Sequence, residues 1–213
     1  MTIRLETAKD YRAVETLTRE AFWNVYRPGC TEHFVINQYR KNPAFIPELS
    51  FVMEENGRII GHVMYSKAEL LLDDGSRFPS WTFGPISIHP EYQGRGYGLR
   101  LLNYSLSKAR EMGVGFLCME GNINFYRHAG FDLASRYHIH YYADRKMTMY
   151  LISSPRNLSP AIWEASKPHT NLPKVISQPR TTPRHLPNTK PNFHKKKRLL
   201  WKDNCHNSVK VAA

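Results

Sequence analysis

The segment that most narrows the choice of fold is a glycine-rich turn, residues 93–98, between a strand pattern and a helix pattern. Glycine occupies positions 94, 96 and 98. Glycine adopts positive φ without steric cost, so successive N–H groups can point into one concave nest. The following helix adds the partial positive charge of its N-terminus, and Arg95 adds a counter-charge. Such turns also occur as simple connections, but here the order of the neighbouring elements favours a diphosphate cradle.

The strand pattern before this turn, residues 78–88, changes phase at Gly84-Pro85. The residue pairs on either side of the change are Trp81 with Phe83 and Ile86 with Ile88. A one-residue slip with glycine and proline at the break is typical of a β-bulge. We expect the bulge to splay this strand from its neighbour and to leave backbone groups free to bind something else.

The other patterns in the first 154 residues alternate between strands and helices. We expect strands at Thr2–Leu5, 49–53, 59–71, 114–119, 131–142 and 147–151. We expect helices after the Thr7/Asp10 capping signal and over residues 31–41, 99–112 and 122–128. Turns are expected at Asn56-Gly57 and at residues 73–75. Together they predict an α/β fold built on a mixed sheet.

The composition changes abruptly after Ser154. Of the net charge of +12, residues 1–154 carry little, with 18 Lys and Arg against 16 Asp and Glu, whereas residues 155–213 carry 12 against 2. Eight of the 14 prolines lie in this second part, and no helical or strand period survives there. We therefore expect one domain at 1–154 and a Pro-rich, basic, disordered tail at 155–213.

Three interpretations of this tail stay open. The basic cluster at residues 194–198 with Trp201 could contact nucleic acid or an anionic surface in a salt-sensitive way. The tail could also be a solvated end without a function. The third interpretation is an altered reading frame after about Ser154. We rank the second and third together above a functional tail.

The three cysteines, Cys30, Cys118 and Cys205, show no metal-type or redox-type spacing, and no apolar run is long enough to cross a membrane. The N-terminus shows no signal-peptide pattern. We expect a cytoplasmic protein with free thiols and without a metal site or a membrane contact.

Two segments resemble the signatures of the GCN5-related N-acetyltransferases, the GNAT family. Residues 93–98 are similar to its Gln/Arg-x-x-Gly-x-Gly/Ala motif, and residues 122–131 to its aromatic-Tyr-x-x-x-Gly-Phe segment. The element order matches over about two-thirds of the chain. The Gly-Pro-Ile-Ser strand and the Glu-Gly-Asn turn are similar to a small bacterial branch whose substrates are mostly undefined. In that branch the chain usually continues with acidic and apolar residues that finish the fold, and the sequence after Ser154 lacks that character.

This resemblance implies acetyl-CoA as a co-substrate. Its pantetheine arm would lie in the splayed gap like an added strand, and its pyrophosphate would lie on the glycine turn. The residues implied in binding are Ile86, Ser87 and Ile88 for the arm, Gln93, Gly94, Arg95, Gly96, Tyr97 and Gly98 for the turn, and Asn122 from the other side.

The resemblance also implies direct transfer, in which a deprotonated amine attacks the thioester. Tyr126 lies where the family often keeps the acid that protonates the departing thiolate; the alternative is a packed aromatic residue. Glu120 closes the buried strand and could be the base, directly or through a water, or simply a strand-end charge. The histidines at 62, 89, 138 and 140 are weaker candidates for the base. Cys118 is expected to be a core thiol.

We therefore expect an N-acetyltransferase that acts on a primary amine of a small molecule. A protein or peptide amine is the first alternative. A cofactor-binding or nucleic-acid-associated module with little turnover is the second. The acceptor and a homodimeric state are left open.

Overall fold

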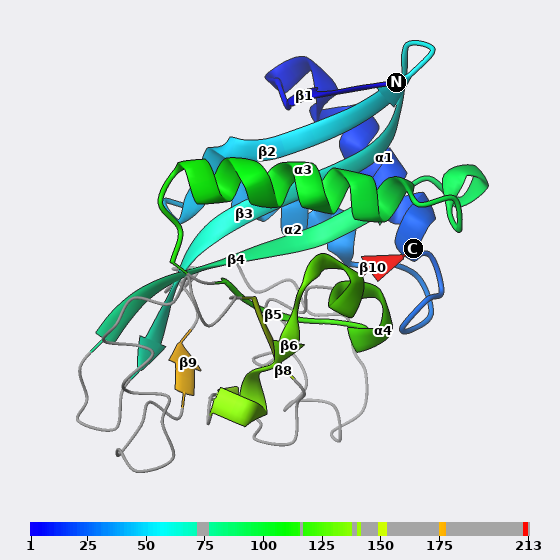
Figure 1. The fold of residues 1–213 in the computed structure, drawn as a ribbon. Coiled ribbons are helices and arrows are strands. Elements are labelled where there is room, and N and C mark those ends of the chain that lie inside the picture. The colour runs from blue at the N-terminus through cyan, green and yellow to red at the C-terminus, as the bar shows by residue number, and fades with distance from the viewer. Residues whose placement is uncertain are drawn as a thin grey trace, which may run out of the picture.

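In the computed structural model, the described residues are 1–71, 77–115, 117–137, 140–141, 149–152, 175–177 and 211–212. They form a mixed sheet with the strand order β1-β2-β3-β4-β5-β8-β6, and helices cover both faces (Figure 1). The strands are β1 (Thr2–Leu5), β2 (Phe45–Glu55), β3 (Arg58–Leu71), β4 (Arg77–Ile88), β5 (Leu117–Glu120), β6 (Asp132–Leu133) and β8 (Met149–Ile152). The predicted α/β class is confirmed.

Each face of the sheet has its own apolar core. The three long helices are α1 (Tyr11–Phe22), α2 (Glu32–Tyr39) and α3 (Tyr97–Glu111). Val14 of α1 and Ile36 of α2 are fully buried in one core, whereas Leu102 and Leu106 of α3 are buried in the other. Burying a leucine side chain contributes about 1.5–3 kcal/mol, so α3 is held to the sheet mainly by its apolar stripe.

The start of α1 is fixed by the capping signal. The N–H and Oγ1 of Thr7 both donate to Asp10 Oδ2 at 2.8 Å. Arg4 donates to both carboxylate oxygens of Asp10, at 2.8 and 2.9 Å. These bonds from Arg4, with those from Thr7, hold the pKa of Asp10 well below its usual range. The predicted helix start is therefore confirmed.

The bulge in β4 lies where the sequence predicts it. Tyr65 of β3 pairs with Phe83, and Val63 pairs with Ile86, so β4 has one more residue than β3 between these pairs. The extra residue falls at Gly84-Pro85, where Gly84 has a φ of 133°. Because of the bulge, Phe83, Ile86 and Ile88 all reach the same buried core despite their change of phase.

Beyond the bulge, β4 and β5 separate. The two strands pair in parallel only at Trp81 and Leu117. From there to Ile88 the edge of β4 has no pairing with β5, which is the predicted splay. The four residues of β5 are buried throughout, and the strand begins three residues later than the expected start at 114.

The predicted strand over residues 131–142 is wrong. The described residues of this range form the short β6, then a 3₁₀ turn at Ala134–Tyr137 and the two-residue β7 (His140–Tyr141). Asp132 accepts a hydrogen bond from its neighbour's N–H, Leu133, at 2.8 Å, and pairs with Arg136 at 3.0 Å. These local bonds favour a turn over an extended chain.

Two short strands lie within residues 155–213. β9 (Val175–Ser177) pairs with β3 and β7, and β10 (Val211–Ala212) pairs with β4. The sequence showed no strand period at either place. The expected turn at 73–75 and the basic cluster at 194–198 lie outside the described residues, so the character of the tail stays a prediction.

Candidate functional site

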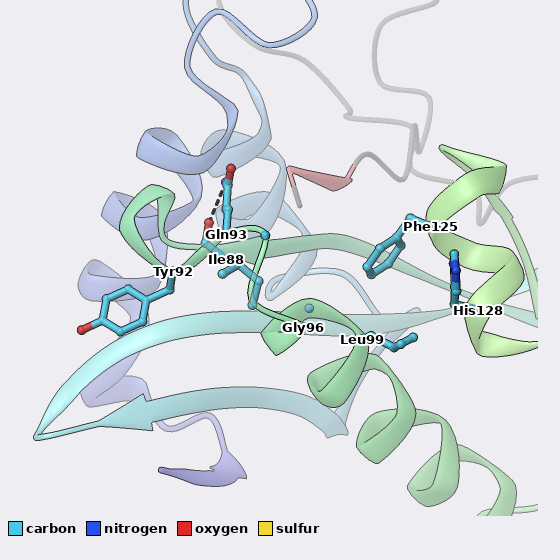
Figure 2. A pocket seen from close by; sticks show the side chains of 9 residues that line it. Ile88, Tyr92, Gln93, Gly96, Leu99, Phe125 and His128 are labelled. Carbon is cyan, nitrogen blue, oxygen red and sulfur yellow. Dashed lines mark hydrogen bonds between the residues drawn. The ribbon is translucent and has the colours of Figure 1, made fainter.

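The glycine turn joins the end of β4 to the start of α3. The side-chain amide of Gln93 donates to the carbonyl of Ile88 at 3.0 Å and so fastens the turn to the strand (Figure 2). Gly94 and Gly96 have φ of 71° and 79°, in the left-handed region that a side chain disfavours. Gly96 is also the N-cap residue of α3. The two glycines turn the chain sharply enough to aim the helix start at the strand end.

The start of α3 has the properties of an anion site. The first N–H groups of a helix have no partner within the helix, which here applies to Tyr97, Gly98 and Leu99. The dipole of this 15-residue helix adds partial positive charge at the same end. Arg95 is exposed, with its guanidinium 6.0 Å from the centre of the Tyr92 ring. A cradle at this position would be built from backbone N–H groups, with one cation beside it.

A pocket of about 490 Å³ opens at this turn (Figure 2). It is lined by Ile88, Tyr92, Gln93, Gly94, Gly96, Gly98, Leu99, Phe125 and His128. A Cβ on Gly98 would lie 3.4 Å from two ring carbons of Phe125. The Phe125 ring therefore packs directly against Gly98 beside the pocket.

Sequence reasoning missed the far wall of this pocket. Phe125 and His128 belong to α4 (Ile123–Tyr126) and the 3₁₀ turn after it, and they face the glycine turn across the pocket (Figure 2). The sequence did contain a signal for Phe125, because it is the aromatic residue of the second signature segment. The sequence prediction assigns a role to its neighbour, Tyr126, and none to Phe125.

The edge of β4 beyond the bulge is the second part of the site. Ile86, Ser87 and Ile88 are all buried, and Ser87 Oγ lies 3.0 Å from Thr18 Oγ1 on α1. In this structure Val211 and Ala212 of β10 pair in parallel with Ile86 and Ser87. An extended chain can therefore pair with this edge.

Tyr126 lies beside the bulge and is fully buried. Its ring meets Phe83 at 5.9 Å and Phe131 at 5.2 Å between centroids, both edge-on. Burial raises the pKa of Tyr126 well above its usual value, and Tyr26 and Tyr65 raise it further. The phenol therefore keeps its proton over the whole physiological range.

The two other predicted site residues take different positions. Glu120 ends β5 with only 6% of its surface exposed, and it is not among the residues that line the glycine pocket. Asn122 is exposed and caps α4, with its Oδ1 accepting the N–H of Asn124 at 2.9 Å. The capping bond leaves the amide NH₂ of Asn122 available for another partner.

Two of the histidines considered as a base, His62 and His89, lie beside glutamates. His62 is buried beside Glu6, with 3.6 Å between Nε2 and Oε1. His89 Nε2 lies 3.2 Å from Glu20. Within the described part of the chain, no group of three His, Cys, Asp or Glu residues could hold a metal, and no helix is long and apolar enough to span a membrane.

The proteins that this chain is similar to are acetyltransferases. The profile described as the acetyltransferase (GNAT) family matches residues 15–131. The uncharacterized N-acetyltransferase YjhQ of Escherichia coli K12 is 29% identical over 86 residues, which is 40% of this chain and about half (47%) of that protein. The uncharacterized N-acetyltransferase YhbS from the same strain is 23% identical over 138 residues, 64% of this chain and 77% of that one.

Two solved structures share the fold. A GNAT family acetyltransferase from Brucella melitensis, in complex with acetyl-CoA, has a TM-score of 0.55 and 28% identity, and covers 62% of this chain and 82% of that chain. The structure of YhbS from Escherichia coli, in complex with CoA, has a TM-score of 0.65 and 17% identity. The match covers 83% of this chain and 88% of that chain.

Proposed function

The chain belongs to the GNAT family of acetyltransferases, and from this we propose that it binds acetyl-CoA and acetylates the primary amine of a small molecule. We assign the reaction to residues 1–154 and no catalytic residue to 155–213. The acetyl-CoA complex of the Brucella melitensis relative supports the choice of co-substrate.

One observation carries the proposal: α4 contacts both halves of the site through consecutive residues. Phe125 meets Gly98 on the glycine turn, and Tyr126 meets Phe83 at the bulge. Gly84 and Ile88 are four residues apart on one strand, which spans roughly 13 Å at about 3.3 Å per residue. The proposed anion cradle and the proposed proton donor would thus lie at the two ends of one open strand edge.

The residues present fit acetyl-CoA. The N–H groups of residues 95–98 would hold the pyrophosphate, and Gln93 and Gly94 shape the turn that presents them. The backbone of Ile86, Ser87 and Ile88 would pair with the amides of the pantetheine arm. Pairing with β10 on the same edge supports this role. The free NH₂ of Asn122 would contact the arm from the opposite side.

Acetyl-CoA supplies the thioester whose acetyl group is transferred. The acceptor must first lose a proton, because an amine with a pKa near about 10.4 is almost wholly charged at neutral pH. We assign Glu120 as the base that accepts this proton, directly or through a water. An N–H on the bulged strand would stabilise the negative charge that develops on the thioester oxygen. Tyr126 would protonate the departing sulfur, so an amide and a free thiol result.

A screen of acceptors tests this proposal. The full chain is incubated with acetyl-CoA and panels of small primary amines or of peptides, and release of free CoA thiol is followed with a thiol reagent. We expect turnover with at least one small amine and none with the peptides. Turnover with peptides alone would replace the acceptor class, whereas binding of acetyl-CoA without turnover on either panel would favour a binding module.

A further inference from the structure

A distant segment of the chain occupies the open edge of β4. β10 pairs with β4 in parallel, with Val211 opposite Ile86 and Ala212 opposite Ser87. In Figure 1 this short red strand lies next to β4, on the side of α4. It also contacts α1, so it is held from two sides.

This position coincides with the place where a ligand would bind. Pairing between β4 and β5 ends at Trp81 and Leu117, so the edge that β10 uses is the one that the splay leaves open. A backbone N–H or carbonyl group on a strand edge pairs with one neighbouring chain at a time. An extended arm and β10 therefore cannot both pair with Ile86 and Ser87.

We propose that Val211–Ala212 is a built-in competitor of acetyl-CoA, which closes the site when it docks and opens it when it leaves. The proposal rests on the function given above, because it assigns the same strand edge to the pantetheine arm. Docking uses strand addition, in which main-chain hydrogen bonds give the affinity and little depends on side chains.

The size of the segment suits a reversible device. A two-residue parallel pairing makes few hydrogen bonds, each worth about 1 kcal/mol net, so a ligand can displace it. Because the segment belongs to the same chain, its docking is intramolecular and does not depend on protein concentration. A segment docked in about nine of ten molecules would weaken the apparent affinity for acetyl-CoA about tenfold.

The test uses a matched pair of variants in the full chain. Val211→Pro removes an N–H and fixes φ within β10, whereas Ala213→Pro makes the same change one residue beyond the strand. Calorimetric titration with acetyl-CoA should give a Kd about tenfold lower for Val211→Pro than for the parent, and no change for Ala213→Pro. Equal Kd values in all three chains overturn the proposal.

A second measurement needs no acetyl-CoA. Hydrogen exchange followed by mass spectrometry should show faster exchange in the peptide containing residues 86–88 for Val211→Pro than for the parent and Ala213→Pro. Unchanged exchange overturns the proposal even if acetyl-CoA fails to bind. Faster exchange without any acetyl-CoA binding would retain the docking and contradict the proposed function instead.

Discussion

At the scale of single residues, two aromatic neighbours take different positions at the candidate site. Phe125 is half-buried against the glycine pocket, whereas Tyr126 is fully buried against the bulge. Successive residues on a short helix point in different directions, so one turn of α4 serves both places. The signature segment contains both residues, but Phe125 becomes a wall of the pocket only through the docking of α4 on α3, and no local pattern encodes that docking.

Replacement of Tyr126 by phenylalanine tests the proposed acid. We expect kcat to fall about 100-fold or more, the range for loss of a positioned proton donor, with little change in the Kd for acetyl-CoA. Because the pKa of Tyr126 is raised, its acid form persists as pH rises, so the parent should show no loss of kcat from this group up to about pH 10. Steady-state kinetics across pH 6–10 measure the fall in kcat for the variant and the pH dependence of kcat for the parent.

Tyr65→Phe is the matched control, because Tyr65 is equally buried and its hydroxyl lies 2.8 Å from Ser105 Oγ inside the core. Loss of that bond should cost about 1 kcal/mol of stability and leave kcat close to the parent value. An equal fall in kcat for both variants would mean that Tyr126 acts only through packing.

Replacement of Gly98 by leucine tests the cradle. A side chain here would lie against the Phe125 ring and project toward the pocket, while the backbone of Gly98 is helical and tolerates it. We expect the Kd for acetyl-CoA to rise at least about tenfold, which is 1.4 kcal/mol of binding free energy. Calorimetry gives the Kd, and far-UV circular dichroism checks the fold.

Gly115→Leu serves as the control for Gly98→Leu, because nothing lies within 4 Å of a Cβ at that glycine. Its Kd should equal that of the parent. If Gly98→Leu binds acetyl-CoA as tightly as Gly115→Leu does, the pyrophosphate does not lie against the start of α3.

At the scale of elements, a buried ionic cluster ties α2 to the sheet. Arg40, just after α2, pairs with Glu6 and with Glu15, and the side chains of Arg40 and Glu6 are only 5% and 1% exposed. Ser50 Oγ donates to Glu6 at 2.8 Å. Burial alone would raise the pKa of Glu6, but His62 and Arg40 outweigh it and lower the pKa to about 2. No local sequence pattern indicates this cluster, because its members are far apart in the chain.

The stability of the fold should therefore fall in acid. The pKa of Glu6 is lower in the folded state than its usual value of 4.5, so the stabilisation is complete above pH 4.5 and is lost as pH falls toward 2. Glu6→Gln should lower the free energy of unfolding by roughly 3 kcal/mol at pH 7, because it leaves a buried cation short of a partner. Between pH 4.5 and 2, the free energy of unfolding should then fall less for the variant than for the parent. Urea unfolding at several pH values measures this difference.

Glu15→Gln is the control for this cluster, because Glu15 binds the same guanidinium but its side chain is 29% exposed. We expect this substitution to lower the free energy of unfolding by less than about 1 kcal/mol. The pH dependence of its stability should follow that of the parent. If Glu6→Gln and the parent lose the same stability between pH 4.5 and 2, Glu6 is not the group responsible.

The sequence predicts most elements but not all of their partners. The phase slip at Gly84-Pro85 correctly gives the bulge, because strand alternation is a local property that a single residue interrupts. The strand over residues 131–142 is a wrong prediction, since side-chain bonds at Asp132 compete with extension. The pairing of β10 with β4 cannot be read at all, because a two-residue strand has no period and its partner lies more than a hundred positions earlier.

At the scale of the whole molecule, the chain combines a nearly neutral body with a basic tail whose end segment lies in the site. Family membership rests on residues 15–131. The site needs little else, since the bulge, the glycine turn and α4 all lie within that range. β10 is the exception, and through it residues 155–213 can affect binding without contributing a catalytic group.

The central claim is that the glycine turn binds the pyrophosphate of acetyl-CoA while the β4 edge pairs with its pantetheine arm. Calorimetric titration of the full chain with acetyl-CoA and with S-acetyl-pantetheine, which lacks the pyrophosphate, tests it most directly. We predict micromolar binding of acetyl-CoA and at least about 100-fold weaker binding of S-acetyl-pantetheine, a difference of about 2.7 kcal/mol. Equal affinities, or no binding of acetyl-CoA by either the parent or Val211→Pro, would contradict the account.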